Sequence, residues 1–232
     1  MVELGAAEND PTNVFTELLL ELHAEEGVER TVEVIVERAR SALLCDEAGV
    51  LLVERGKIET AGATSETVRQ ADELQRALEE GPCLSSIESG DLYVIEDMGS
   101  ETRWPRWARG AAELGFGSLI SVPLATRDHR LGSINLFSRQ PGAFDENDVS
   151  VAHVFSRHAA LAVEHERHTH NLLSAIDSRK LIGQAQGILM ERYGIDADRA
   201  FGVLSRYSQT HNVKLRDVAA RIVENRTLPG MR

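Results

Sequence analysis

After Asp145 the chain contains no proline until Pro229, and this proline-free stretch limits what its last third can fold into. Proline interrupts helices because it lacks the backbone N–H and clashes with the preceding turn. Apolar residues recur at helical spacing throughout the stretch, so we expect helices only. Residues 145–190 are predicted to form nearly one continuous helix, and two shorter helices follow it.

The part before Asp145 mixes strand and helix patterns. Short β-forming runs at 50–53 and 57–64, and at 118–124 and 131–137, predict strands, the last two as an antiparallel pair. Their alternating apolar residues bury one face of a sheet: Val122, Leu124, Ile134 and Leu136. A further short strand is predicted at 92–95, and helices at 28–44, 65–80 and 104–114, with Ser65 as an N-cap. An amphipathic pattern also begins near Phe15.

The fold class is therefore α+β: an antiparallel sheet with flanking helices, joined by a long helix to an all-α three-helix bundle. Each bundle helix has an apolar face. The predicted core positions are Leu181, Ile182, Ala185, Ile188 and Leu189, then Ala197, Ala200, Phe201, Leu204 and Ser208, then Leu215, Val218, Ala219, Ile222 and Val223. Gly194 and the candidate N-cap Asp196 separate the first two helices, and His211-Asn212 separates the last two.

Charge divides the chain unevenly. The net charge of −12 taken alone argues against nucleic acid as a partner. Residues 171–232, however, carry ten basic and six acidic side chains, or +4, whereas residues 1–170 carry the other 15 basic and 31 acidic ones, or −16. Such asymmetry between halves is typical of a module that faces nucleic acid.

The acidic half contains an ordered series of motifs that resembles a GAF domain of the actinobacterial type. The motifs are Gly81-Pro82-Cys83, Val94-Ile95-Glu96-Asp97, Arg103-Trp104-Pro105, Gly115-Phe116-Gly117-Ser118, Val122-Pro123-Leu124, Leu131 to Leu136, and Phe144. The resemblance implies a central antiparallel sheet with helices packed on it and a pocket for a small ligand. We expect Gly115, Gly117 and Gly132 to mark strand starts with special backbone angles.

The basic half resembles an ANTAR domain, an RNA-binding module of transcription antitermination. The resemblance rests on Ser178 to Arg192, with the core Ala185-Gln186-Gly187-Ile188-Leu189-Met190, and on Ala200-Phe201, Leu204, Ser208-Gln209, Lys214-Leu215-Arg216 and Val218-Ala219. One departure is Gln186, which stands where the family often has Lys. The lost charge weakens attraction to phosphate.

Candidate RNA-binding residues follow from the outward faces of these helices. Gly183 and Gly187 lie four apart, away from the apolar stripe, and allow close approach by an RNA backbone or another helix. Basic side chains neutralise phosphates, and Gln can bond base edges or 2′-hydroxyls. The candidates are Arg179, Lys180, Gly183, Gln184, Gln186, Gly187, Arg192, Arg199, Arg206, Gln209, Lys214 and Arg216.

Candidate ligand-binding residues in the acidic half are Cys83, Trp104, Trp107 and Phe116. Cys83 follows Gly81-Pro82 at a predicted turn, where a reactive or ligand-attached thiol is one interpretation. The aromatic residues can line a pocket or simply pack the core. No cofactor is evident, and two alternatives stay open: the GAF-like domain binds an unknown small molecule, or it binds nothing and serves only for dimerisation.

Five histidines lie in the long helix: His153, His158, His165, His168 and His170. His158 and His165 are seven apart and would share one seam of a helix pair, so a pH-responsive dimer contact and an ordinary polar surface are both open. No Cys or carboxylate set completes a metal site, and the two cysteines lack zinc spacing.

Several function classes are excluded. No apolar run is long enough to span a membrane, and the acidic N-terminus lacks a signal-peptide pattern, so we expect a cytoplasmic protein. No P-loop, GxSxG or HExxH motif is present, and no catalytic residues are assigned.

The sequence thus predicts a signal-responsive RNA-binding regulator that acts by antitermination on RNA stem-loops, as a homodimer through the long helix and the GAF-like domain. Predicted boundaries are a flexible tail 1–12, the GAF-like domain 13–165, a helical linker 166–178, the ANTAR-like bundle 171–226 and a tail 227–232. Three alternatives remain: a DNA-binding regulator, a module in which Gly183 and Gly187 pack a partner helix, and a small-molecule sensor whose tail only dimerises. A further hypothesis is that the acidic half covers the basic bundle until a signal arrives.

Overall fold

The computed structural model describes residues 27–226, so the predicted tails and the pattern near Phe15 lie outside the described residues. The chain divides into two compact units, Met1–Arg167 and His168–Arg232, which are called the N-terminal and C-terminal units below. Each unit has its own hydrophobic core. The predicted α+β fold class is confirmed.

Five strands of the N-terminal unit form one antiparallel sheet in the order β2-β1-β5-β4-β3. The strands are β1 (Glu47–Glu54), β2 (Lys57–Ala63), β3 (Tyr93–Ile95), β4 (Ser118–Ala125) and β5 (Arg130–Ser138). The predicted antiparallel pair forms as β4 and β5 at the middle of the sheet. In the register of the sheet, Asn135 of β5 lies opposite Gly49 of β1 and Ser121 of β4.

Seven helices are described. They are α2 (Val28–Ala42), α3 (Glu66–Leu78), α4 (Pro82–Ser89), α5 (Pro105–Glu113), α6 (Glu146–Tyr193), α7 (Ala197–His211) and α8 (Leu215–Asn225). The long proline-free helix is α6, with 48 residues. Two helix starts follow the predicted local chemistry: the side chain of Ser65 accepts from the amide of Val68, and the side chain of Asp196 accepts from the amide of Arg199.

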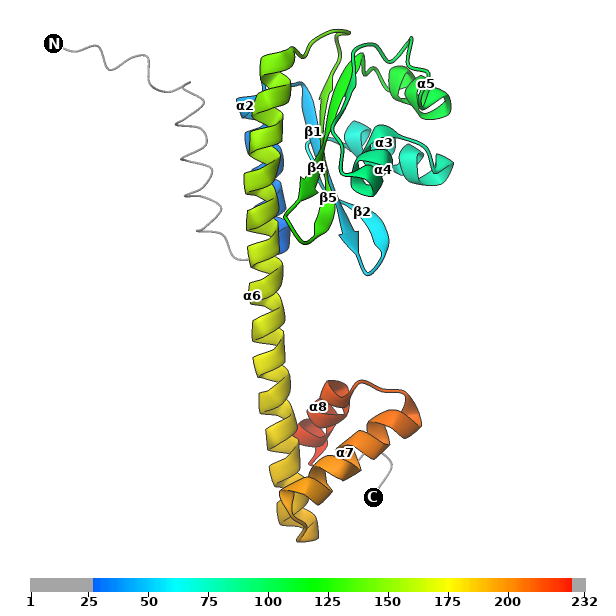
Figure 1. Cartoon of the computed structure of the whole chain (residues 1–232). Coiled ribbons are helices and arrows are strands. Elements are labelled where there is room, and N and C mark those ends of the chain that lie inside the picture. The colour runs from blue at the N-terminus through cyan, green and yellow to red at the C-terminus, as the bar shows by residue number, and fades with distance from the viewer. Residues whose placement is uncertain (1–26, 227–232) are drawn as a thin grey trace, which may run out of the picture. The chain divides into compact units, whose positions relative to one another are not determined.

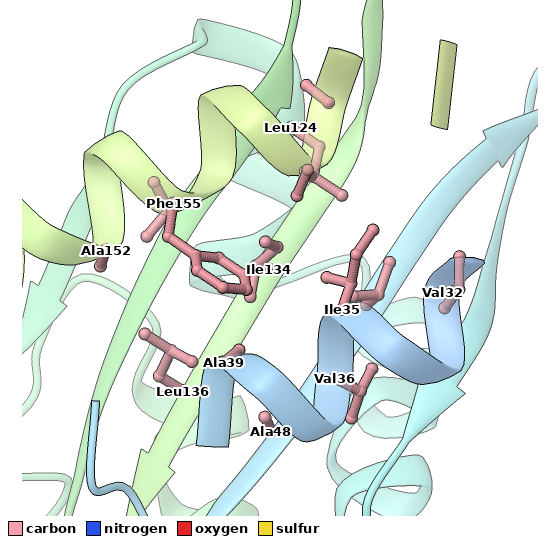
Figure 2. Close-up of a cluster of buried hydrophobic side chains, with 14 of the residues drawn as sticks. Val32, Ile35, Val36, Ala39, Ala48, Leu124, Ile134, Leu136, Ala152 and Phe155 are labelled. Carbon is pink, nitrogen blue, oxygen red and sulfur yellow. The ribbon is translucent and has the colours of Figure 1, made fainter. Parts of the chain in front are cut away.

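Helices α2 and the first part of α6 cover one face of the sheet (Figure 1). Figure 2 shows how Phe155 of α6 points toward Ile134 and Leu136 of β5, beside Ile35 and Ala39 of α2. All five side chains are buried. The predicted alternation along β4 and β5 therefore does face a hydrophobic core.

The opposite face of the sheet is covered by α3, α4 and α5 (Figure 1). Leu119 of β4 and Phe137 of β5 join Trp107 of α5 in a second cluster of buried side chains. Because this face is also closed, the polar residues that alternate with the apolar ones on β4 and β5 are removed from solvent as well.

Of the three glycines predicted to have special backbone angles at strand starts, only one has a positive φ. Gly115 has a φ of +91°, which favours glycine, as predicted. Gly132 has no positive φ. A Cβ atom there would lie 1.8 Å from the carbonyl oxygen of Leu51, so the neighbouring strand approaches too closely for any side chain. Gly117 likewise meets backbone, with the carbonyl oxygen of Arg139 at 2.6 Å.

The region around Cys83 corrects the sequence interpretation. Residues 82–89 form helix α4, with Pro82 at its start and no turn at Cys83. Proline suits that first position because its missing N–H has no intrahelical partner there. The helix buries Cys83 and Ile87 against Leu51 of β1.

In the C-terminal unit, α7 and α8 pack against the last part of α6. The predicted core of the first and third helices is confirmed, with Ala185, Leu189 and Ile222 fully buried. Phe201 is wrong as a core residue, since 44% of it is exposed. Val203 and Tyr207 pack on the core in its place.

We predict that Phe155→Ala destabilises the N-terminal unit by about 3–5 kcal/mol, because the lost ring leaves a cavity between α2 and the sheet. The neighbouring exposed variant His153→Ala should change stability by less than about 0.5 kcal/mol. Urea unfolding followed by tryptophan fluorescence measures both, since both tryptophans lie in this unit. Equal effects would contradict the assigned packing.

Candidate functional site

The exposed face of α7 presents several of the predicted RNA-binding residues. Arg199, Gly202, Arg206 and Gln209 are all exposed. Arg199 also lies near the N-cap, with its Nε 3.7 Å from the carboxylate of Asp196. Both partners are well exposed, so the pair contributes little energy and the guanidinium can exchange it for phosphate.

A groove of about 610 Å³ follows this face of α7. We call it the α7 groove. It is lined by Ile195, Arg199, Gly202, Val203, Arg206, Tyr207, Thr210 and His211. The rings of Tyr207 and His211 stack with centroids 4.0 Å apart and planes 19° from parallel. Of the residues that line the groove, the sequence predicted only Arg199 and Arg206 as RNA-binding residues.

A second groove, of about 640 Å³, runs between α6 and α8. Gln184, Gly187 and Arg192 line it, together with Glu191 and Arg226. Arg192 donates from Nη1 to the carbonyl oxygen of Arg226 at 2.7 Å. This bond satisfies the C-terminal end of α8, so Arg192 has a structural task beside any contact with RNA.

The remaining candidate RNA-binding residues are spread over the C-terminal unit. Arg179, Lys180 and Gly183 lie exposed on α6, and Lys214 and Arg216 lie exposed at the start of α8. Gln186 is half-buried and donates from Nε2 to the carbonyl oxygen of Ala197 at 3.1 Å. The residue that departs from the family pattern therefore links α6 to the start of α7.

Three helical glycines of the C-terminal unit face open space. At Gly183, Gly187 and Gly202 an added Cβ atom would meet nothing within 4 Å. None of the three has a positive φ. Packing within the unit therefore does not require glycine at these positions, although glycine costs a helix interior up to about 1 kcal/mol relative to alanine.

The four candidate ligand-binding residues lie on the side of the sheet that α3, α4 and α5 cover, where the three aromatic residues share one buried cluster and Cys83 belongs to another. Cys83, Trp104, Trp107 and Phe116 are all buried. The indole N–H of Trp107 donates to the carbonyl oxygen of Ala71, and that of Trp104 donates to the hydroxyl of Ser85. The aromatic residues act here as core packing with satisfied N–H groups.

Gln75 of α3 makes two hydrogen bonds to Cys83. Gln75 donates from Nε2 to the Cys83 sulfur at 2.7 Å, and its Oε1 accepts from the Cys83 amide at 2.9 Å. Burial raises the pKa of Cys83 and so disfavours the nucleophilic thiolate.

A buried polar cluster, missed by sequence analysis, lies on the same face of the sheet. We define it as Thr60, Asp72, Ser121, Ser133 and Asn135. Thr60 donates to one carboxylate oxygen of Asp72, and Ser121 donates to the amide oxygen of Asn135. Three of its buried atoms have no hydrogen-bond partner: Oδ1 of Asp72, Oγ of Ser133 and Nδ2 of Asn135. Buried polar groups are normally paired, so these three atoms are unusual for the interior of a folded protein.

Asp72 is the ionisable member of this cluster. Burial raises its pKa from 3.8 to about 7, against the opposing effects of the Thr60 hydroxyl and the guanidinium groups of Arg76 and Arg69. Its alternating strand neighbours Ser121 and Asn135 looked solvent-facing in the sequence. Only the covering helices reveal that the carboxyl group is enclosed.

The histidines of α6 do not assemble into a metal site. Among residues 27–226, no group of three or more His, Cys, Asp or Glu side chains could hold a metal ion. His153, His165, His168 and His170 are exposed, and His158 is half-buried. Nor does any helix in the described part of the chain have the length and apolar character needed to cross a membrane.

An antiparallel sheet covered on both faces, followed by an exposed basic bundle, defines a two-part regulator with a sensor and an output module. The chain belongs to the GAF domain family, whose model matches residues 25–164, and it carries an ANTAR domain at residues 170–223. GAF domains are sensors and ANTAR domains bind RNA, so this chain is a signal-responsive regulator.

Solved structures share the fold of the N-terminal unit. The GAF domain of an Acinetobacter phosphoenolpyruvate-protein phosphotransferase is 14% identical, with a TM-score of 0.55 over 68% of this chain and 94% of that one. The corresponding Coxiella burnetii domain is 15% identical, with a TM-score of 0.56 over 71% and 99%. A free methionine-R-sulfoxide reductase from Neisseria meningitidis is 15% identical, with a TM-score of 0.56 over 73% and 98%. A comparison with curated protein sequences gives no match.

We predict that the stability of the wild-type protein falls as pH rises and that the stability of Asp72→Asn depends less on pH. The native carboxyl group binds its proton up to about pH 7, whereas the unfolded one loses it near 3.8, so the native state holds more protons in between. Stability therefore falls as pH rises through this window, by up to about 1.4 kcal/mol per pH unit.

Urea unfolding of wild type and Asp72→Asn from pH 5 to 8 measures the difference, and Asp91→Asn, an exposed acid, serves as the matched control. Parallel pH curves for wild type and Asp72→Asn would contradict the enclosed carboxyl group.

Proposed function

We propose that the protein is a signal-responsive RNA-binding regulator that acts by transcription antitermination. Paired C-terminal units bind RNA stem-loops and prevent a terminator from forming. The sensor domain controls how the pair is presented. The observation that carries this proposal is the exposed face of α7, where Arg199 and Arg206 border one groove within the ANTAR domain.

Electrostatics supports pairing of the RNA-binding units. A single C-terminal segment of +4 gives only a weak phosphate attraction. Two segments on one RNA gain affinity because the second binding event is intramolecular. The acidic N-terminal segment, at −16, also repels RNA, and this directs binding to the C-terminal unit.

Helix α6 offers apolar surface for a homodimer. Leu161 is 58% exposed, and Val154, seven residues earlier, is 47% exposed. Farther along, Leu172 and Ile176 lie four apart and are 53% and 59% exposed. Residues seven or four apart share a helix face, so a second copy of α6 would cover them. No residue from 164 to 184 is fully buried, and between 170 and 177 all residues but Ser174 are exposed, which supports pairing through this part of α6.

The small-molecule signal belongs to the N-terminal unit in this proposal. The buried polar cluster, with three unpaired atoms, is the place in that unit where a bound polar molecule would change hydrogen bonding most. Cys83, Trp104, Trp107 and Phe116 form part of the same helix-covered layer and would respond to its occupancy.

We predict that Arg199→Glu with Arg206→Glu abolishes RNA retention without unfolding the bundle, because two phosphate contacts become repulsive. The slope of log affinity against log salt should fall by about two. Nitrocellulose filter retention of the RNA that crosslinks to wild type measures the loss, and circular dichroism checks the fold.

The matched control is Lys57→Glu with Arg106→Glu, which makes the same change of net charge on exposed positions of the N-terminal unit. Unchanged retention by the α7 double variant, or equal loss by the control, would remove this face from the interface. Duplex DNA as competitor separates RNA from DNA binding.

We also predict that Leu161→Glu with Leu172→Glu converts a dimer into a monomer, since the new charges would be buried in the seam. Sedimentation velocity gives the mass. His153→Glu, at an exposed position of the same helix, should leave the dimer intact. A monomeric wild type at tens of micromolar would refute pairing through α6.

A further inference from the structure

We infer that the α7 groove is a binding site for one unpaired RNA base, held between two arginine-bound phosphates. The inference rests on the proposed RNA-binding function and names the part of the RNA that α7 takes. The bound base belongs to a single-stranded loop, because the bases of a stem are paired and stacked and cannot enter a side pocket.

The floor of the groove suits a flat apolar surface. Gly202 leaves it open at its middle, with no atom within 4 Å of where a Cβ would stand. Ile195 and Val203 supply half-buried aliphatic side chains that cannot compete for hydrogen bonds. A cavity volume of about 610 Å³ admits a planar base together with the water around its edge.

A prebuilt aromatic stack forms one side. Tyr207 and His211 lie one helical turn apart with their rings stacked at 4.0 Å. The Nδ1 atom of His211 is 3.0 Å from the carbonyl oxygen of Tyr207, which fixes the imidazole plane. His211 is exposed, so its outer face can extend the stack by one base. Every base has a π-face, and this mode of contact tolerates different bases.

Two guanidinium groups flank the opening. Arg199 and Arg206 are seven residues apart on α7, which separates them by about 10 Å along the helix axis. Gly202 and Val203 lie between them in the sequence. A nucleotide whose base enters above Gly202 therefore has a positive group on each side of it for its neighbouring phosphates. This combination of apolar floor, aromatic wall and paired cations favours a nucleotide over an apolar peptide.

The test uses the full chain and a pool of stem-loop RNAs with a constant stem and a randomised loop that contains 4-thiouridine. Irradiation should crosslink the loop to Tyr207 or His211, identified by mass spectrometry of the peptide. The variant Gly202→Leu fills the groove, and it should remain folded because leucine is the better helix former and its Cβ atom meets nothing within 4 Å.

We expect Gly202→Leu to lose the crosslink and to weaken hairpin affinity at least about tenfold. For the same stem closed by an abasic loop, Gly202→Leu and the wild-type protein should bind with equal affinity. Ala197→Leu, which adds similar bulk to α7 outside the groove lining, is the matched control and should behave as wild type. Melting temperatures of both variants report folding.

The outcomes separate this inference from the proposed function. If wild type binds the hairpins but Gly202→Leu binds them equally, or the crosslink falls elsewhere, the base site is wrong and RNA binding stands. If wild type binds no hairpin, abasic or not, the RNA-binding function itself fails. Retention of an acidic, aromatic peptide with no RNA bound would assign the groove to a protein partner instead.

Discussion

Two hydrophobic cores depend on a single helix. Helix α6 supplies Phe155 and Val163 to the core of the N-terminal unit, and Ala185 and Leu189 to that of the C-terminal unit. In the N-terminal unit α6 packs with α2 on one face of the sheet, and in the C-terminal unit it packs with α7 and α8. No residue from 164 to 184 is fully buried, although Leu181 and Ile182 at its end pack against the core of the C-terminal unit. The same helix therefore contributes residues to both cores and runs between them with little buried surface of its own.

The distribution of polar groups differs between the two units in a way that matches their tasks. In the N-terminal unit the unusual polar groups are enclosed: Asp72 of α3 and Asn135 of β5 are both buried and retain unpaired atoms. In the C-terminal unit the unusual groups face solvent, as Arg199, Arg206 and Gly202 do. An enclosed polar group responds to small molecules and protons, whereas an exposed basic groove responds to a macromolecular polyanion.

Local rules explain which features could be predicted from the sequence. The caps at Ser65 and Asp196 depend on residues three positions away, and the β4–β5 pair depends on alternation within a few residues, so both were correct. The exposed glycines of α6 followed from helical periodicity.

Tertiary packing explains the failures. Phe201 has a core-like position by spacing, but Val203 and Tyr207 occupy the core side of α7 instead. Helix α4 has only eight residues and no clear periodic signal, so Cys83 looked like part of a turn. The burial of Ser133 and Asn135 depends on helices whose docking no strand pattern encodes. The α7 groove combines Ile195, which precedes the helix, with the Tyr207–His211 stack, and it likewise exists only in three dimensions.

The placement of the two cysteines allows their chemical reactivity to report on the sensor domain. Cys45 and Cys83 are the only cysteines of the chain, and both are buried in the N-terminal unit. Burial raises the pKa of Cys45 to about 12, and it raises that of Cys83 as well. Cys83 is fully buried, so a thiol reagent reaches it only when the N-terminal unit opens locally. The rate of alkylation at Cys83 therefore reports how often the GAF domain opens. The C-terminal unit has no cysteine and does not contribute to that rate.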